Sequence, residues 1–235
     1  MSAGVLRSPD VASAPDAMRP QPESLHEPAG WSPENFAREQ IRGLVRQVFF
    51  SNSVRPVRQV VFSALEPETD LRSLCQSVGE ALALQTPATV AVVGEFPRLL
   101  PGADAQHDEL AERGIKDGRM PLRQIAARVR ANLWLVPDRE RGDSATASPL
   151  HSYLGEVRLQ FEYSIVQART AGESDEATAM AQFADGIILV LSAHRTRRAA
   201  ARKIKAELEA ARARVLGTVL SDRVFPIPEA IYRRL

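Results

Sequence analysis

Residues 57–70, VRQVVFSALEPETD, decide the predicted fold of this chain. The run QVVFSA is rich in β-branched and apolar residues, which predicts a buried β-strand over residues 59–64. A short loop over residues 65–69 follows, and the apolar spacing after it predicts a helix over residues 71–84. A strand, a tight loop and a helix in this order form the opening unit of an α/β sheet.

The composition fits a domain of ordinary size. The chain has 235 residues, of which 44% are hydrophobic, enough for one substantial core and a tail. Its formal net charge of +1 gives no general attraction to nucleic acid or to an acidic membrane surface. The single cysteine, Cys75, cannot form an internal disulfide, which fits a reducing compartment. No signal peptide and no membrane span are visible, so we expect a cytoplasmic protein.

The rest of the chain extends this α/β pattern. Residues 1–31, rich in Pro, Ser, Ala and Asp, predict a disordered tail ahead of one α/β domain over residues 32–235. Ser32 and Pro33 predict the start of a leading helix. Strands then alternate with helices, which predicts a doubly wound, mostly parallel α/β sheet whose ligand site lies at the carboxyl ends of the strands. Besides residues 59–64 and 71–84, we expect strands at 89–93, 132–137, 161–166, 186–191 and 215–220, and helices at 122–129, 150–160, 176–183 and 196–213.

Three segments resemble a known family. Residues 39–51, EQIRGLVRQVFFS, resemble the helix that precedes the ATPase core of bacterial tyrosine autokinases. Those are cytoplasmic kinases of capsule and exopolysaccharide export, related to the MinD/ParA ATPases. Residues 183–197, FADGIILVLSAHRTR, and residues 214–220, RVLGTVL, are similar to two strands of the same family. The resemblance implies a P-loop NTPase fold of MinD/ParA type over residues 39–225.

The leading helix of that family carries a Glu-x-x-Arg-x-x-Arg motif that supports contact between subunits in a ring. Glu39 and Arg42 match this motif, Val45 stands at the second arginine, and Arg46 follows one residue later. The resemblance thus implies that Glu39, Arg42 and Arg46 are interaction residues and that the chain could form a homo-oligomer.

The phosphate loop departs from the family pattern, which is Ser-Ala-x-Pro-Gly-Glu-Gly-Lys-Ser-Thr. Aligned on Ser63 and Ala64, this chain has Pro67 and Thr69 in place of the two glycines, Asp70 in place of the lysine and Leu71 in place of the magnesium-binding hydroxyl. Proline offers no N–H to a phosphate, and carboxylates repel it. Two like charges about 4 Å apart repel by roughly 1 kcal/mol even in bulk water. The acids here are Glu66, Glu68 and Asp70.

A structural role explains the same loop. Thr69 is suited to cap the helix that follows, with Asp70 in the first turn of that helix. The chain would then satisfy with its own side chains the helix N-terminus that the family leaves open for phosphate. We therefore expect Glu68 and its neighbours to be structural rather than catalytic.

The two acidic motifs of the family are altered as well. The second strand ends in Gly94 and Glu95, so that only a displaced glutamate remains, and Gln167 replaces the magnesium-associated aspartate after the fourth strand. A neutral amide cannot offset the charge of Mg²⁺ as a carboxylate does. The family's C-terminal tyrosine cluster is reduced to Tyr232. We therefore expect no catalytic residue, no cofactor and no metal.

Other reactive or charged residues give weaker signals. The four histidines have no metal-ligand spacing, His107 lies in a charged loop, and Cys75 lies on an apolar helix face that indicates core packing. A basic run over residues 195–205, including the expected interaction residues Arg195, Arg197 and Arg198, indicates either a solvated helix face or a contact with an anionic surface.

The leading hypothesis is a non-catalytic module of tyrosine-autokinase type, regulatory or scaffolding, in exopolysaccharide biosynthesis or export. Its partners would be an inner-membrane polysaccharide chain-length regulator or a kinase paralogue, which would recruit it to the inner face of the membrane. One alternative is an ATP-binding protein tyrosine kinase or ATPase with an atypical phosphate loop, recognised by ATP turnover lost in Glu68→Gln. Another is a DNA-partitioning relative, recognised by salt-sensitive DNA binding lost on charge reversal at Arg197 and Arg198. Because aromatic residues are not interleaved with the basic run, we expect no nucleic acid partner.

Overall fold

A computed structural model describes residues 32–51, 55–96, 121–138 and 147–222. The tail expected at residues 1–31, the loop with His107, and Tyr232 lie outside the described residues, so the predictions made for them stay predictions. The helices are α1 (Pro33–Phe49), α2 (Leu71–Gln85), α4 (Leu122–Ile125), α5 (Ala147–Gln160), α6 (Glu176–Phe183) and α7 (Arg198–Ala210). The strands are β1 (Gln59–Ala64), β2 (Val90–Gly94), β3 (Ala127–Arg130), β4 (Leu133–Pro137), β5 (Tyr163–Gln167), β6 (Gly186–Ser192) and β7 (Val215–Ser221).

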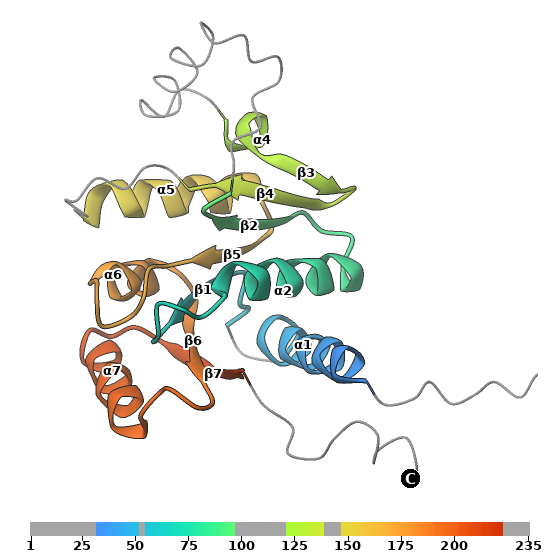
Figure 1. The fold of residues 1–235 in the computed structure, drawn as a ribbon. Coiled ribbons are helices and arrows are strands. Elements are labelled where there is room, and N and C mark those ends of the chain that lie inside the picture. Colours follow the sequence, from blue (N-terminus) through green and yellow to red (C-terminus); the bar gives the residue numbers. More distant parts are fainter. Residues whose placement is uncertain (1–31, 52–54, 97–120, 139–146, 223–235) are drawn as a thin grey trace, which may run out of the picture.

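The strands form one seven-stranded sheet in the order β3-β4-β2-β5-β1-β6-β7 (Figure 1). Every neighbouring pair is parallel except β3 and β4. Helices α1 and α2 pack on one face of the sheet, and α4, α5, α6 and α7 pack on the other. The prediction of a doubly wound, mostly parallel α/β sheet is confirmed.

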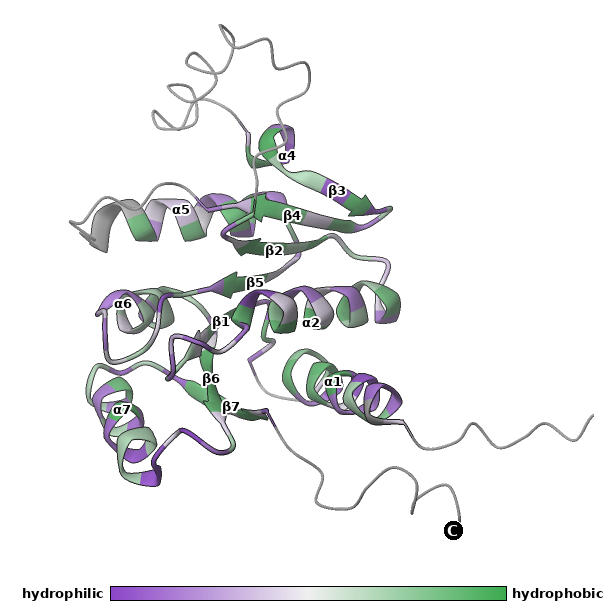
Figure 2. Ribbon diagram, viewed as in Figure 1, coloured by the Kyte–Doolittle hydropathy of each residue, from purple (hydrophilic) through white to green (hydrophobic). Residues whose placement is uncertain are grey.

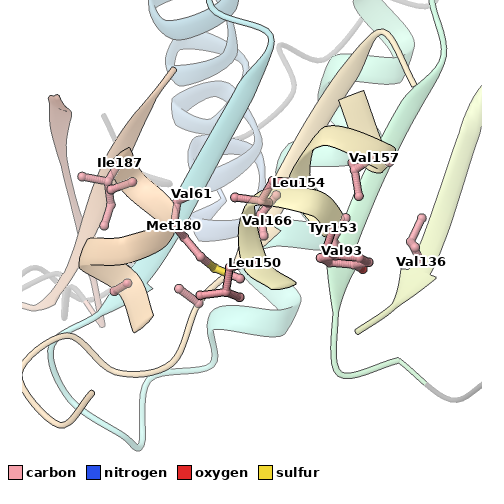
Figure 3. Packing of buried hydrophobic residues seen from close by; sticks show 14 of the residues in the cluster. Val61, Val93, Val136, Leu150, Tyr153, Leu154, Val157, Val166, Met180 and Ile187 are labelled. Atoms are coloured by element: carbon pink, nitrogen blue, oxygen red, sulfur yellow. The ribbon is translucent and has the colours of Figure 1, made fainter. Parts of the chain in front are cut away.

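The sheet core follows directly from the alternation of side chains along its strands. In β1, Val60 and Phe62 point to the α1 and α2 side, while Val61 points to the α5 and α6 side. Figure 3 shows Val61 near Leu154 and Met180 on this second side. Both faces of β1 are covered, which explains why its sequence is a continuous apolar run, and the hydrophobic strands at the centre of Figure 2 reflect this.

The element expected at residues 122–129 is wrong in its second half. The helix α4 ends early because Ala126 turns to extended backbone, and the chain then forms β3, antiparallel to β4. The guanidinium of Arg128 donates hydrogen bonds to the backbone oxygens of Arg130 and Ala131, which closes the turn between the two strands. Helical spacing of the apolar residues predicted a single helix here, but contacts with the edge of the sheet decide the outcome.

Asp185, in the segment 183–197 that resembles the family, joins three elements of the fold. The Asp185 carboxylate accepts hydrogen bonds from the backbone N–H groups of Arg58 and Gln59, both at 2.7 Å, and pairs with the Arg158 guanidinium at 3.0 Å. These contacts tie the beginnings of β1 and β6 to α5.

Among the described residues, no helix is both long and apolar enough to cross a membrane.

Candidate functional site

The candidate site lies at the carboxyl ends of β1, β2, β5 and β6, where parallel α/β sheets bind ligands. The loop over residues 65–70 leaves β1, residues 168–175 leave β5, and residues 193–197 leave β6 (Figure 1). Because β1 pairs with both β5 and β6, these three loops are neighbours at one edge of the sheet.

The loop after β1 is closed by its own backbone. Leu65 N–H donates to the oxygen of Val190 in β6 at 3.1 Å. Thr69 N–H donates to the Glu66 oxygen at 3.1 Å, and Leu71 N–H donates to the Thr69 oxygen at 2.7 Å. These amides are therefore engaged within the protein, whereas a phosphate-binding loop turns its N–H groups toward the ligand.

Asp70 caps the helix that follows this loop. Its carboxylate accepts a hydrogen bond from Ser73 N–H at 3.0 Å and occupies the N-cap position of α2. The prediction that Thr69 is the cap is wrong, because the backbone of Thr69 belongs to the preceding turn and its hydroxyl makes no hydrogen bond within the described part of the chain. An aspartate at this position suits the positive end of the helix dipole.

The cap also shifts the ionisation of Asp70. Hydrogen bonds from the side chain and the backbone N–H of Ser73 hold the pKa of Asp70 below its ordinary value. A carboxyl whose pKa is lowered on folding stabilises the folded chain above its unfolded-state pKa. That contribution is lost as the pH falls through the lower, folded-state pKa. The Asp70 cap therefore stabilises the start of α2 at neutral pH and stops doing so in acid.

Two ion pairs cross the same edge of the sheet. The Glu68 carboxylate lies 3.5 Å from the Arg195 guanidinium in the loop after β6, and the Glu95 carboxylate lies 3.7 Å from the Arg72 guanidinium on α2. All four side chains are at least half exposed, so each pair contributes at most about 1 kcal/mol to stability and weakens with salt. Each of the two carboxylates, Glu68 and Glu95, therefore already has an arginine of the chain beside it.

Gln167 lies between the carboxyl ends of β5 and β2. It stands at the end of β5, in register with Phe62 of β1. A Cβ atom on Gly94 would lie only 2.6 Å from Gln167 Oε1, so the amide packs directly against that glycine. The sequence correctly places Gln167 and Glu95 at the carboxyl edge, where the family resemblance implied the two acidic motifs.

A half-buried ion pair is the feature that sequence analysis missed. Arg169 follows β5, and its Nε atom lies 3.3 Å from Oε2 of Glu176, a residue of α6 that is only 2% exposed. The backbone oxygen of Arg169 also accepts a hydrogen bond from the buried Ser63 hydroxyl at 2.7 Å. The only signal in the sequence was an arginine and a glutamate on either side of the loop at residues 170–175, which does not specify a contact.

The other predicted interaction residues separate into two surfaces. On α1, Glu39, Arg42 and Arg46 are exposed, while Val45 is fully buried against the core. Val45 therefore belongs to the packing face, and Arg46 is the exposed cation beside it. On the opposite side of the sheet, α7 begins at Arg198 rather than at residue 196.

The late start of α7 has a local cause. Ser192 N–H donates to the Thr196 hydroxyl at 2.9 Å, which holds residues 193–196 in a turn. Arg197 and Arg198 are exposed at the end of this turn, at the beginning of the helix. The structure therefore brings only Arg195 to the candidate site, through its pair with Glu68.

The residues present do not fit a nucleoside triphosphate with Mg²⁺. The N-terminus of α2 already holds the Asp70 carboxylate, and the position of the family's lysine is negatively charged. Gln167 supplies a neutral amide where a carboxylate would hold the metal. Within the described ranges, no group of three or more His, Cys, Asp or Glu side chains could hold a metal ion.

Comparison with known proteins identifies the fold. No family model matches the chain, and no curated protein matches it in sequence. Among solved structures, the kinase domain of Escherichia coli tyrosine kinase ETK has a TM-score of 0.61 at 11% identity, covering 82% of this chain and 80% of that chain. The chimerical protein CapA2B2 has a TM-score of 0.60 at 15% identity, covering 83% and 86%. The cell division protein MinD of Aquifex aeolicus has a TM-score of 0.53 at 14% identity, covering 70% and 69%.

These likenesses define the fold of the chain. The chain has the P-loop NTPase-type α/β fold that bacterial tyrosine kinase domains share with MinD. At these identities the likeness concerns the fold, so what the chain does has to be inferred from its own side chains.

Proposed function

We propose that this chain is a non-catalytic module of tyrosine-kinase type, which binds no nucleotide and acts by regulating or scaffolding a protein assembly. The observation that carries the proposal is the hydrogen bond from Ser73 N–H to the Asp70 carboxylate at the start of α2. In a phosphate-binding fold this helix N-terminus is the anion site. Here the anion is a side chain of the protein itself, and bringing a triphosphate to it would place like charges together.

Three further features support the same proposal. The amides of Leu65, Thr69 and Leu71 are engaged in internal hydrogen bonds. Glu68 and Glu95 add two carboxylates at the mouth of the site, each beside an arginine of the chain. Gln167 packs against Gly94, where a metal-binding carboxylate would be needed. Each feature on its own weakens the binding of a phosphate or its metal, and together they oppose both.

The process assignment rests on the likeness to tyrosine kinase domains and on the sequence resemblance to the autokinases of exopolysaccharide export. We infer a role in exopolysaccharide biosynthesis or export, in the cytoplasm and at the inner face of the membrane. The partners would be an inner-membrane chain-length regulator or a kinase paralogue. The exposed side chains Glu39, Arg42 and Arg46 on α1 are the proposed contact surface.

Co-purification tests this role. The tagged full-length chain, isolated from its own cells after mild solubilisation of the membrane, is expected to retain a chain-length regulator or a kinase paralogue. Reversing two charges, Arg42→Glu with Arg46→Glu, should reduce the recovered partner at least tenfold. Arg130→Glu is the matched control, because Arg130 is an exposed arginine on the far edge strand β3. If no export component is recovered with the chain, the proposed role is wrong. An equal loss of partner in Arg130→Glu would show that α1 is not the contact surface.

A further inference from the structure

A groove separates α1 from the edge strand β7. It has a volume of about 760 Å³ and is lined by residues of α1 from Phe36 to Gln47, by Thr69 and Asp70 just before α2, and by residues 218–222. The twelve residues of α1 along it span about 16 Å, given a rise of about 1.5 Å per residue. This length is suited to an extended peptide segment.

The groove exposes surface that a folded protein normally covers. Leu220 on β7 is 53% exposed, and Ile41, Leu44 and Leu74 line the groove while only partly buried. β7 is also an edge strand, with β6 on one side and no further strand beyond it among the described residues (Figure 1). Exposed apolar side chains beside an open strand edge favour the docking of another chain segment.

The charge of the groove selects its occupant. The charged side chains that line it are Glu39, Asp70 and Asp222, all acidic. Residues 223–235, RVFPIPEAIYRRL, carry three arginines and one glutamate. Residues 1–31, which precede α1, carry four acids and two arginines, so the groove would repel them. Complementary charge therefore favours the segment that follows β7 over the segment that precedes α1.

Connectivity favours the same segment. Residue 223 follows Asp222 directly, and Asp222 lines the groove with a positive φ of 56°, which turns the chain at the end of β7. Thirteen residues reach at most about 43 Å when extended, more than twice the length of α1 along the groove. The segment carries apolar residues that suit the groove, namely Val224, Phe225, Ile227, Ile231 and Leu235.

We propose that residues 223–235 dock in the groove between α1 and β7 of the same chain. The apolar side chains cover Leu220 and its neighbours, and the arginines face Glu39 and Asp222. Because the segment is tethered beside its site, its effective concentration is high and modest contacts suffice to hold it. A partner that uses the Glu39 end of α1 must then displace this segment, which makes the tail a regulator of that surface.

Thiol labelling of a cysteine placed in the groove tests the proposal. In Leu220→Cys, the new thiol should react slowly with a maleimide in the full-length chain and at least tenfold faster after removal of residues 223–235. The native Cys75 does not interfere, because it is fully buried and burial raises the pKa of its thiol. The matched control is Leu159→Cys, 89% exposed on α5, whose labelling rate should not change.

A second variant covers the case in which truncation destabilises the fold. Full-length Leu220→Cys carrying Ile231→Asp should label as fast as the truncated chain, since the aspartate would replace an apolar contact with a negative charge in a groove lined by Glu39, Asp70 and Asp222. Equal labelling rates with and without the segment would overturn the proposal. So would protection that persists without the segment and increases with protein concentration, because the occupant would then be a second copy of the chain.

Discussion

Replacing Arg169 by alanine is expected to lower the free energy of unfolding by about 3 kcal/mol. The guanidinium of Arg169 lies 3.3 Å from a carboxylate oxygen of Glu176, and Glu176 is only 2% exposed. Without the arginine, a buried carboxylate loses this cation, which costs more than the loss of a pair whose two side chains are both exposed, although the Arg169 side chain is itself 55% exposed. Urea unfolding followed by circular dichroism measures the change.

Two variants make this result specific. Arg195→Ala removes the cation of the exposed pair with Glu68 and should cost less than about 1 kcal/mol. Adding Glu176→Gln to Arg169→Ala should recover part of the lost stability, because a neutral amide no longer requires a cation. Equal losses in the Arg169 and Arg195 variants would show that burial does not strengthen the inner pair.

Gly186→Ala is the second substitution with a large expected effect, a loss of about 3 kcal/mol in the free energy of unfolding. A Cβ atom at the start of β6 would lie 2.6 Å from the backbone oxygen of Arg214, which precedes β7. This backbone oxygen cannot move aside as a flexible side chain can, because it accepts a hydrogen bond from Ile187 N–H at 2.8 Å. The substitution should therefore separate β6 from β7 at this end of the sheet.

The same sheet offers a matched control for this glycine. Gly217 of β7 pairs with Ile188 of β6, and a Cβ atom there would meet nothing within 4 Å. Gly217→Ala should raise stability by about 0.5 kcal/mol, because alanine restricts the unfolded chain more than glycine does. Thermal unfolding of both variants decides the matter, and a similar loss in each would contradict the steric argument.

Much of the fold could be predicted because burial leaves a strong mark on sequence. Both faces of β1, β2 and β6 are covered, so their residues form nearly continuous apolar runs. The helix α6 was predicted with its observed bounds for the same reason. The edge strand β3 was missed because three of its four residues are exposed and the strand is defined by its pairing with β4.

The candidate site was harder to predict because its contacts join distant loops. The sequence predicted an altered loop from Pro67 and Asp70, since proline offers no N–H to a phosphate and aspartate adds a negative charge. The sequence could not identify the capping residue, because Thr69 and Asp70 are both good capping residues. Only the turn from Glu66 to Thr69 decides between them. The pairs of Glu68 with Arg195 and of Arg169 with Glu176 depend on how the loops meet in space.

The central claim is that this chain keeps a nucleotide-binding fold without nucleotide binding. Calorimetric titration of the purified full-length protein with ATP and ADP, with and without Mg²⁺, tests it most directly. We expect no saturable binding up to millimolar nucleotide under any of these conditions. Saturable binding at micromolar nucleotide would contradict the account, because the loop from Leu65 to Asp70 would then hold phosphate despite its carboxylates and the engaged amides of Leu65 and Thr69.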